Sequence, residues 1–255
     1  MAVGFTVAAD AYDRFMGRYS VPLAVEFIRL ADIGSGQRCL DVGCGPGALT
    51  ARLVSVVGTG LVAAVDPSAP FVAAAKDRLP GVDIRAGTAE DLPFPDQTFD
   101  VSLAQLVVHF MSNPVAGLRE MARVTRSGGV VAACVWDHAG ERGPLSPFWQ
   151  AVHKLDSLAP TEALLAGTAK GQLTELFHTA GLKDIEQATL DVRVQFDSFA
   201  DWWEPFTLGV GPAGDYVNGL DARHQRELRS ACAELLPAAP FVVEAMAWAV
   251  RARTR

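Results

Sequence analysis

The segment LDVGCGPGAL, residues 40–49, leads from an apolar run through a glycine-rich turn into a helical pattern. The next apolar run, Leu61–Val65, is followed by Asp66, about 20 residues beyond Gly45. Strand, turn, helix, strand and acid in this order are typical of a Rossmann-like unit that binds an adenosine-containing cofactor, with the acid placed to bind a ribose. Glycine at Gly43 and Gly45 lets the backbone approach the ligand and turn sharply.

The remaining pattern predicts the fold class. Runs of strand length alternate with helical patterns, which indicates a mainly parallel sheet with helices on its faces. We expect strands at Gln37–Val42, Leu61–Val65, Val82–Ala86, Phe99–Leu103, Val130–Trp136, Leu190–Phe196 and Phe241–Val250, and helices at Gly47–Val57, Ala69–Leu79 and from Pro114 onward. The fold expected is α/β, a Rossmann-like seven-stranded, mostly parallel sheet with an antiparallel C-terminal strand and helical cap insertions.

The expected organisation is a single domain over residues 1–255. Within it, residues 1–35 form an N-terminal helical cover, 36–136 the cofactor-binding core, and 137–255 the C-terminal strands with a helical cap. The segment Asp197–Leu236 is expected to be largely helical, with an interruption at Gly209–Gly214.

Composition excludes several classes of protein. Of the 255 residues, 50% are hydrophobic, which supports a large core, and the formal net charge is −7. Nucleic-acid binding needs clustered Lys and Arg, and the one basic tail, Arg251 to Arg255, is expected to be a frayed end. The chain has neither a signal-peptide pattern nor an apolar run of ~18 residues. We therefore expect a cytoplasmic protein without membrane or nucleic-acid partners. Four scattered cysteines indicate neither zinc nor disulfides.

Glycine spacing alone does not identify the cofactor, because Gly43, Gly45 and Ala48 also fit a dinucleotide motif. Asp41, two residues before the first glycine, would repel a pyrophosphate and would suit a ligand with an ammonium group. S-adenosyl-L-methionine (SAM) has an amine, a sulfonium and a ribose, and it has no phosphate. The alternative is that Asp41 only fixes the turn through local hydrogen bonds.

With these features the chain resembles the class I SAM-dependent methyltransferases, and specifically the small-molecule type often described as ubiquinone/menaquinone-biosynthesis-like. The resemblance covers about residues 36–136 and rests on motifs at Leu40–Leu49, Val65–Ser68, Gly87–Phe94, Phe99–Val101, His109 and Ser127–Val130. It implies SAM as the cofactor and a small-molecule acceptor, but it does not identify that acceptor.

The resemblance assigns the cofactor-binding residues. It implies that the glycine turn, with Gly47 included, and the Asp66-Pro67-Ser68 segment bind SAM. Asp66 would accept hydrogen bonds from both ribose hydroxyls, and its alternative role is to cap the helix that Asp-Pro commonly begins.

Thr88 departs from the family, which usually has an acid here to hold the adenine amino group. The Ala89 amide can still bond the ring, and Glu90 or Asp91 either replaces the missing acid or faces water. Gln105 would lie beside the methionine end of the cofactor, or it is a buried structural amide.

Candidates for covering the site and for catalysis are fewer. His109 either lines the acceptor pocket, where it could act as a base, or is a packed core histidine. Residues 12–19 resemble a segment that covers the cofactor, with Arg18 placed to neutralise the methionine carboxylate, although a helix docked permanently on the sheet would look the same. The aromatic residues of the expected cap, Phe199 to Tyr216, suggest an apolar or aromatic acceptor.

The expected function is methyl transfer from SAM to a small, apolar or aromatic metabolite. The sulfonium carries the activated methyl group, so the protein mainly positions and desolvates the reactants. Two alternatives remain open at this stage. One is a cofactor-binding or scaffold protein without enzyme activity, which the departure at Thr88 allows. The other is an NAD-dependent oxidoreductase, which Asp41 disfavours.

Overall fold

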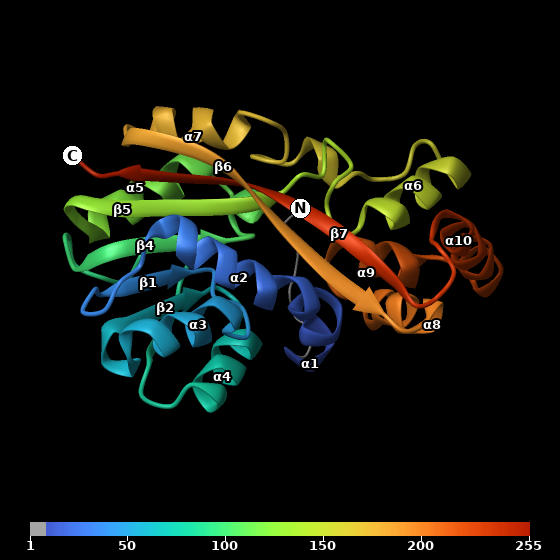
Figure 1. Cartoon of the computed structure of the whole chain (residues 1–255), viewed down its shortest axis with the longest axis horizontal. Coiled ribbons are helices and arrows are strands. Elements are labelled where there is room, and N and C mark those ends of the chain that lie inside the picture. Colours follow the sequence, from blue (N-terminus) through green and yellow to red (C-terminus); the bar gives the residue numbers. More distant parts are fainter. Residues whose placement is uncertain (1–8) are drawn as a thin grey trace.

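The computed structural model describes residues 9–255, so the first eight residues of the expected N-terminal cover lie outside it. Within that range, seven strands form one sheet in the order β3-β2-β1-β4-β5-β7-β6 (Figure 1). The strands are β1 (Cys39–Val42), β2 (Val62–Asp66), β3 (Asp83–Ala86), β4 (Phe99–Gln105), β5 (Thr125–Trp136), β6 (Lys183–Phe196) and β7 (Phe241–Arg253). Strands β1 to β5 are parallel, and β7 pairs antiparallel with both β5 and β6. The expected α/β sheet with its antiparallel C-terminal strand is confirmed.

Helices cover both faces of the sheet (Figure 1). The α-helices are α1 (Ala9–Tyr12), α2 (Arg18–Ala31), α3 (Ala48–Val57), α4 (Ala69–Arg78), α5 (Pro114–Val124), α6 (Ser146–Leu155), α7 (Gln172–Ala180), α8 (Phe199–Trp203), α9 (Gly211–Gly219) and α10 (Ala222–Leu235). Short 3-10 or π turns are η1 (Asp13–Gly17), η2 (Thr59–Leu61), η3 (Val108–Phe110), η4 (Glu162–Leu164) and η5 (Glu204–Leu208). Helices α2, α3 and α4 pack into one apolar core, and α5 and α7 pack into the other.

The two-residue period of a strand decides which side chain faces which core. In β1, Leu40 and Val42 join the core that contains α5, whereas Cys39 joins the core that contains α3. All four side chains of β1 are buried, as is usual for a central parallel strand. Asp41 is therefore directed toward α3, at the end of the strand where the glycine turn begins.

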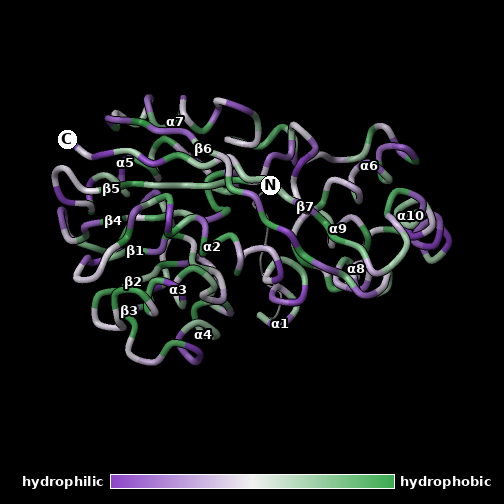
Figure 2. The backbone as a smooth tube through the Cα atoms, viewed as in Figure 1, coloured by the Kyte–Doolittle hydropathy of each residue, from purple (hydrophilic) through white to green (hydrophobic). Residues whose placement is uncertain are grey.

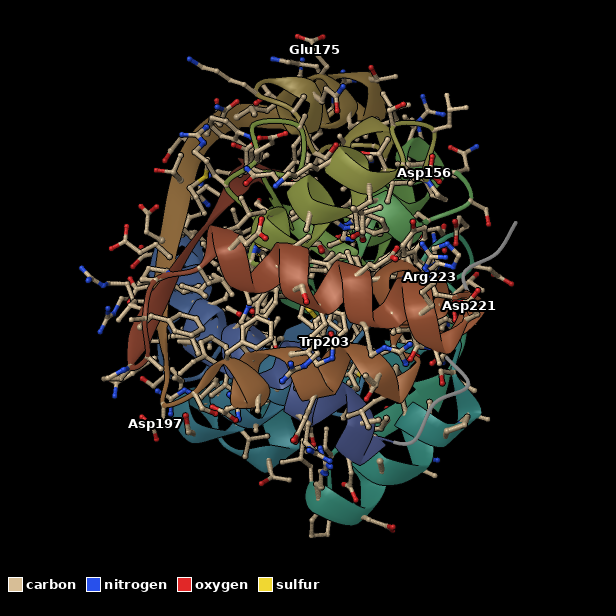
Figure 3. The ribbon with its side chains drawn as sticks, turned by 90° about the vertical axis from the view of Figure 1, so that its right-hand side faces the viewer. Asp156, Glu175, Asp197, Trp203, Asp221 and Arg223 are labelled. Atoms are coloured by element: carbon tan, nitrogen blue, oxygen red, sulfur yellow. The ribbon has the colours of Figure 1, made fainter. Side chains whose placement is uncertain are left out.

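Strands β6 and β7 extend well beyond the rest of the sheet. Residues 247–253 of β7 pair with β5, while Phe241–Met246 pair only with β6. Helices α6, α8, α9 and α10 gather around this extension and form the cap, which Figure 3 views end-on with Trp203 beneath α10. Helix α10 is largely hydrophilic on its outer side, whereas β4 and β5 are mostly hydrophobic (Figure 2).

The structure corrects three local expectations. Strand β5 begins at Thr125 rather than after the Ser127-Gly128-Gly129 turn, because Thr125 pairs with Phe99 and a register shift absorbs the extra residues. The basic tail is not frayed, since Arg253 pairs with both Val130 and Lys183. Helix α9 begins at Gly211, inside the expected interruption.

No helix in the described range, residues 9–255, has the length and apolar character needed to cross a bilayer.

Candidate functional site

The glycine-rich turn between β1 and α3 is fixed against the end of β2. The Gly43 amide donates to the Val65 carbonyl at 2.7 Å, and the Gly45 amide donates to Asp66 Oδ2 at 2.8 Å. Gly43 has φ +72°, and a Cβ at this position would lie 2.4 Å from Cγ2 of Val107. Only glycine fits such a close approach. A Cβ on Gly45 would meet no atom within 4 Å, so this part of the turn borders open space.

That open space is a cavity of about 470 Å³ at the carboxyl ends of β1, β2 and β4, the usual ligand position in an open α/β sheet. Its lining includes six of the residues expected to bind the cofactor, namely Gly43, Gly45, Asp66, Pro67, Ser68 and Gln105. Apolar and aromatic side chains such as Phe71 and Val107 complete the wall. Among the described residues, the lining has one carboxylate and no basic side chain. This charge suits a cationic ligand and opposes a pyrophosphate.

Asp66, the last residue of β2, holds two turns together at the cavity wall. Its Oδ2 accepts from the Gly45 amide, and its Oδ1 accepts from the Ser68 amide at 2.8 Å. Burial raises the pKa of Asp66, and the two amide hydrogen bonds oppose that rise. Ser68, not Asp66, is the N-cap residue of α4. Because each carboxylate oxygen has a second lone pair, ribose binding by Asp66 remains a prediction that this geometry allows.

Asp41 is 1% exposed and lies behind the cavity wall rather than in it. Its Oδ2 accepts from Thr50 Oγ1 in α3 at 2.6 Å, so Asp41 ties the strand to the helix across the turn. Burial raises the pKa of Asp41 to about 7, against the opposing effect of the Thr50 hydrogen bond. The structure thus shows that Asp41 fixes the turn through a local hydrogen bond, which was the alternative role. A contact between Asp41 and a ligand ammonium stays a prediction.

The segment around Thr88 lies outside the cavity lining in the described chain, as does Gly47 of the turn. Thr88 pairs with Asp91 in an isolated bridge, and Ala89 is buried. Glu90 Oε1 accepts from the Asn113 amide at 3.1 Å, which connects this turn to the start of α5. Adenine binding by this segment therefore stays a prediction.

Gln105, the last residue of β4, is a buried amide held by the protein and also lines the cavity, so the structure is compatible with both roles that the sequence left open. Its Nε2 donates to the Ser20 carbonyl of α2 at 3.0 Å, which anchors the amide. Its Oε1 is buried and receives no hydrogen bond from the described residues. Since Gln105 also lines the cavity, this oxygen is available for a donor on a ligand.

Residues 9–19 contribute Tyr12 to the cavity wall, and they contact α4 and the cap. Tyr12 lines the cavity and packs edge-on against Phe71, with ring centroids 5.3 Å apart. Asp13 pairs with Arg78 of α4 at 2.6 Å. Arg18 does not face the cavity as expected, because its guanidinium forms a two-point ion pair with Asp201 of the cap.

A narrower pocket of about 50 Å³ lies beside the cavity under the cap. Tyr12, Leu106 and Phe110 line both spaces, so the pocket adjoins the cavity at these side chains.

His109 lines this narrow pocket and is 7% exposed. Its ring packs on Phe110, with centroids 3.9 Å apart, and its Nδ1 has no hydrogen-bond partner among the described residues. Burial holds the pKa of His109 well below its usual range, so the imidazole is neutral at physiological pH.

The narrow pocket also contains two polar residues that the sequence analysis missed. His138 lies two residues beyond β5, where the rule that placed Gln105 after β4 would also have placed it. Glu162 belongs to η4 in a loop-rich segment, and no pattern in the sequence marks it. The cap aromatics are not its lining, since Trp202, Trp203 and Phe206 pack into the cap core instead.

Comparison with known proteins adds the family. Residues 40–133 match the family model described as methyltransferase domain. An uncharacterized methyltransferase of Schizosaccharomyces pombe is 34% identical over 147 residues, which cover 50% of this chain and 52% of the relative. The chloroplastic 2-methyl-6-phytyl-1,4-hydroquinone methyltransferase 2 of Oryza sativa subsp. japonica is 33% identical over 176 residues, which cover 67% of this chain and 46% of that protein. The chain spans about half the length of these relatives.

Solved structures agree on the fold. The YcgJ protein of Bacillus subtilis superposes with a TM-score of 0.59 over 91% of this chain and 98% of its own, at 19% identity. An identity this low supports the fold alone. The sequence match, the strand order and the cavity at the glycine turn agree with one another. Over residues 40–133 the chain is therefore similar to the methyltransferase domain family, and this similarity implies S-adenosyl-L-methionine as the cofactor.

Proposed function

We propose that this protein transfers the methyl group of SAM to a small apolar or aromatic metabolite, as a ubiquinone/menaquinone-biosynthesis-like enzyme. The observation that carries the proposal is the direct contact between an acidic cavity and a narrow, mostly apolar pocket, with Tyr12, Leu106 and Phe110 shared between them. The rice relative is named for an aromatic hydroquinone, which supports this acceptor class. We also propose that residues 1–255 act as a single domain.

The chain's residues fit the cofactor. Asp66 offers its carboxylate to the ribose, and the unpartnered Gln105 Oε1 offers an acceptor to an ammonium or hydroxyl group. Bound SAM supplies a methyl group that is already activated by a positively charged sulfur. The remaining task of the protein is to align the acceptor behind that methyl group and to exclude water, which Tyr12 and the residues around it do by covering the cavity.

The first experiment asks which cofactor binds. We expect calorimetry to show binding of SAM and of S-adenosylhomocysteine, and no binding of NAD, because the described cavity lining has a carboxylate and no basic group for a pyrophosphate. Transfer from SAM would then be screened on small phenols, hydroquinones, amines and fatty acids. Tighter binding of NAD than of SAM would refute the proposed function.

The affinity for SAM is expected to rise with pH between about 6 and 8. A cationic ligand favours the ionised form of Asp41, and burial places the pKa of that carboxyl at about 7. Below that pH, binding must first remove a proton from Asp41, so affinity falls by up to about tenfold per pH unit. Calorimetric titrations at pH 6 and 8 would measure this change. The Asp41→Asn variant should show a weaker pH dependence than wild type, and a wild-type affinity that does not change with pH would leave Asp41 with a structural role only.

A further inference from the structure

The narrow pocket brings together three polar side chains from separate parts of the fold. His109 comes from η3 after β4, His138 follows β5, and Glu162 begins η4. Apolar side chains, among them Phe15 and Trp136, form much of the remaining wall. A small apolar space with a few convergent polar groups is typical of a ligand site.

Glu162 is held in place by a hydrogen bond to one of its two carboxylate oxygens. It is 5% exposed, and its Oε2 accepts from Trp149 Nε1 of α6 at 2.7 Å. Thr161 caps the η4 turn by accepting from the Ala163 amide at 3.1 Å. No other residue in the range 9–255 donates a hydrogen bond to this carboxyl group. Glu162 also lines the pocket, and its Oε1 accepts no hydrogen bond from the described residues.

The Glu162 carboxyl also lacks a cation. Among the described residues it forms no ion pair, and its pKa is set by burial and by the Trp149 hydrogen bond. Burial raises its pKa to about 7 and the hydrogen bond opposes that rise. An uncompensated buried carboxyl is costly to stability, and such groups gather at functional sites.

Burial keeps the three other titratable side chains that line the pocket, Tyr12, His109 and His138, neutral. Burial lowers the pKa of His138 to about 4 and that of His109 further below its usual range. Burial raises the pKa of Tyr12, which therefore keeps its proton. From α6, His153 stacks on the Trp149 ring, with centroids 6.1 Å apart. At neutral pH, Glu162 is thus the group in this pocket whose charge changes.

Charge balance distinguishes Glu162 from His109 as a proton acceptor. A proton moved to a histidine would create a buried imidazolium, which the low polarity of the site opposes. A proton moved to Glu162 neutralises a buried carboxylate at the moment the nearby sulfonium loses its charge. In a site of low dielectric, a reaction that removes two opposite charges is favoured over one that relocates a charge. The carboxyl is also the group whose pKa lies near the working pH, as an efficient general base requires.

We propose that Glu162 Oε1 accepts the proton of the methyl acceptor, and that this acceptor is a neutral aromatic compound whose hydroxyl group reaches into the narrow pocket. The inference rests on the proposed function and names its substrate class. In the step, the hydroxyl O–H bond breaks and its proton passes to Oε1. The sulfur–methyl bond breaks and a bond forms from that carbon to the acceptor's oxygen, or to a ring carbon, whose own proton then passes to water while the acceptor's oxygen takes a proton back from water. S-adenosylhomocysteine leaves with the electron pair of the broken bond, and Glu162 returns its proton to water.

The same arrangement disfavours other acceptors. A carboxylic acid would bring a second negative charge against Glu162. A protonated amine would pair with Glu162 but would stand beside the sulfonium, and like charges repel strongly in a buried site. A neutral hydroxyl avoids both costs and donates a hydrogen bond to Oε1.

Binding of simple probes tests the substrate class without turnover. We would titrate phenol, anisole, benzoate and benzylamine into protein saturated with S-adenosylhomocysteine. We expect phenol to bind about tenfold more tightly than anisole, because anisole cannot donate to Glu162, and we expect benzoate and benzylamine to bind more weakly than phenol. In Glu162→Gln the preference for phenol over anisole should shrink. Glu141→Gln, at an exposed glutamate that contacts Gln150, should keep it.

A stability measurement tests the carboxyl independently of binding. Folded protein holds one more proton than unfolded protein between the ordinary pKa of a glutamate and about 7, so wild-type protein loses stability as pH rises through this window. The melting temperature of Glu162→Gln minus that of wild type should therefore be larger at pH 8 than at pH 5.

Transfer to phenol or to any acceptor found by screening should rise with pH near 7 in wild type. The Glu162→Gln variant should be at least tenfold slower on the plateau.

Several results would overturn the proposal. These are tighter binding of benzoate or benzylamine than of phenol, no binding of any of the four probes, an unchanged preference in Glu162→Gln, or full transfer activity of that variant. In each case SAM would still bind to the cavity, so the proposed function would stand. Loss of SAM binding by the wild-type protein would instead refute the function itself.

Discussion

Replacing Asp66 with alanine is expected to weaken SAM binding by about 2–4 kcal/mol, because two charge-assisted hydrogen bonds to the ribose would be lost. This corresponds to an increase in Kd of between one and a half and three orders of magnitude. The same substitution removes the acceptor for the Gly45 and Ser68 amides, so the turn itself becomes less ordered. Calorimetry with SAM measures the loss, and circular dichroism checks that the fold survives.

Two further variants separate these contributions. Asp66→Asn keeps one acceptor oxygen but lacks the charge, so its Kd should lie between those of wild type and Asp66→Ala. Asp83→Ala removes a half-exposed carboxylate from the neighbouring strand, where it pairs with Arg85, and should leave Kd unchanged. If Asp66→Ala bound SAM as tightly as wild type, Asp66 would serve only to fix the two turns.

Replacing Gly43 with alanine is expected to lower the free energy of unfolding by about 2–5 kcal/mol, with a marked loss of SAM affinity. The new Cβ would lie 2.4 and 2.6 Å from the two methyl groups of Val107, and the backbone has φ +72°. A left-handed conformation costs a non-glycine residue about 1–2 kcal/mol, and overpacking adds about 1–3 kcal/mol. Chemical denaturation with and without SAM measures both effects.

The steric and conformational parts of this cost can be told apart. Gly36→Ala, at φ +85° with no atom within 4 Å of a new Cβ, pays only the conformational cost and lies outside the site. The double variant Gly43→Ala/Val107→Ala removes the clash and should recover the overpacking part. A Gly43→Ala protein no less stable than Gly36→Ala would show that Val107 moves aside freely.

Local patterns were sufficient to place the glycine turn, Asp66 and Gln105 at one cavity. The strand, turn and helix at residues 40–49, followed by Asp66, specify a parallel βαβ unit, and the handedness of that unit places Gly45 beside Asp66. The carboxyl ends of parallel strands meet at one edge of the sheet, which also placed Gln105 at the cavity. These relations hold between neighbours in the sheet, so short-range sequence signals determine them.

Other expectations failed where distant segments compete for the same side chain. Arg18 was expected at the methionine carboxylate, yet it pairs with Asp201, a residue of the cap far along the chain. The basic tail was expected to fray, yet Arg251 donates to the Leu30 carbonyl and pairs with Glu186. An ion pair between distant segments leaves no periodic trace in a sequence.

The sequence by itself determined the α/β class and the position of the glycine turn between the first strand and its helix, because each depends on a contiguous motif whose geometry is set by backbone conformation. Only the tertiary structure decided the narrow pocket. Glu162 lies in an irregular loop, and its burial against Trp149 beside His109 depends on how the cap closes over the sheet. Burial sets the charge of each of these groups, and burial is a property of the packed fold rather than of any single segment.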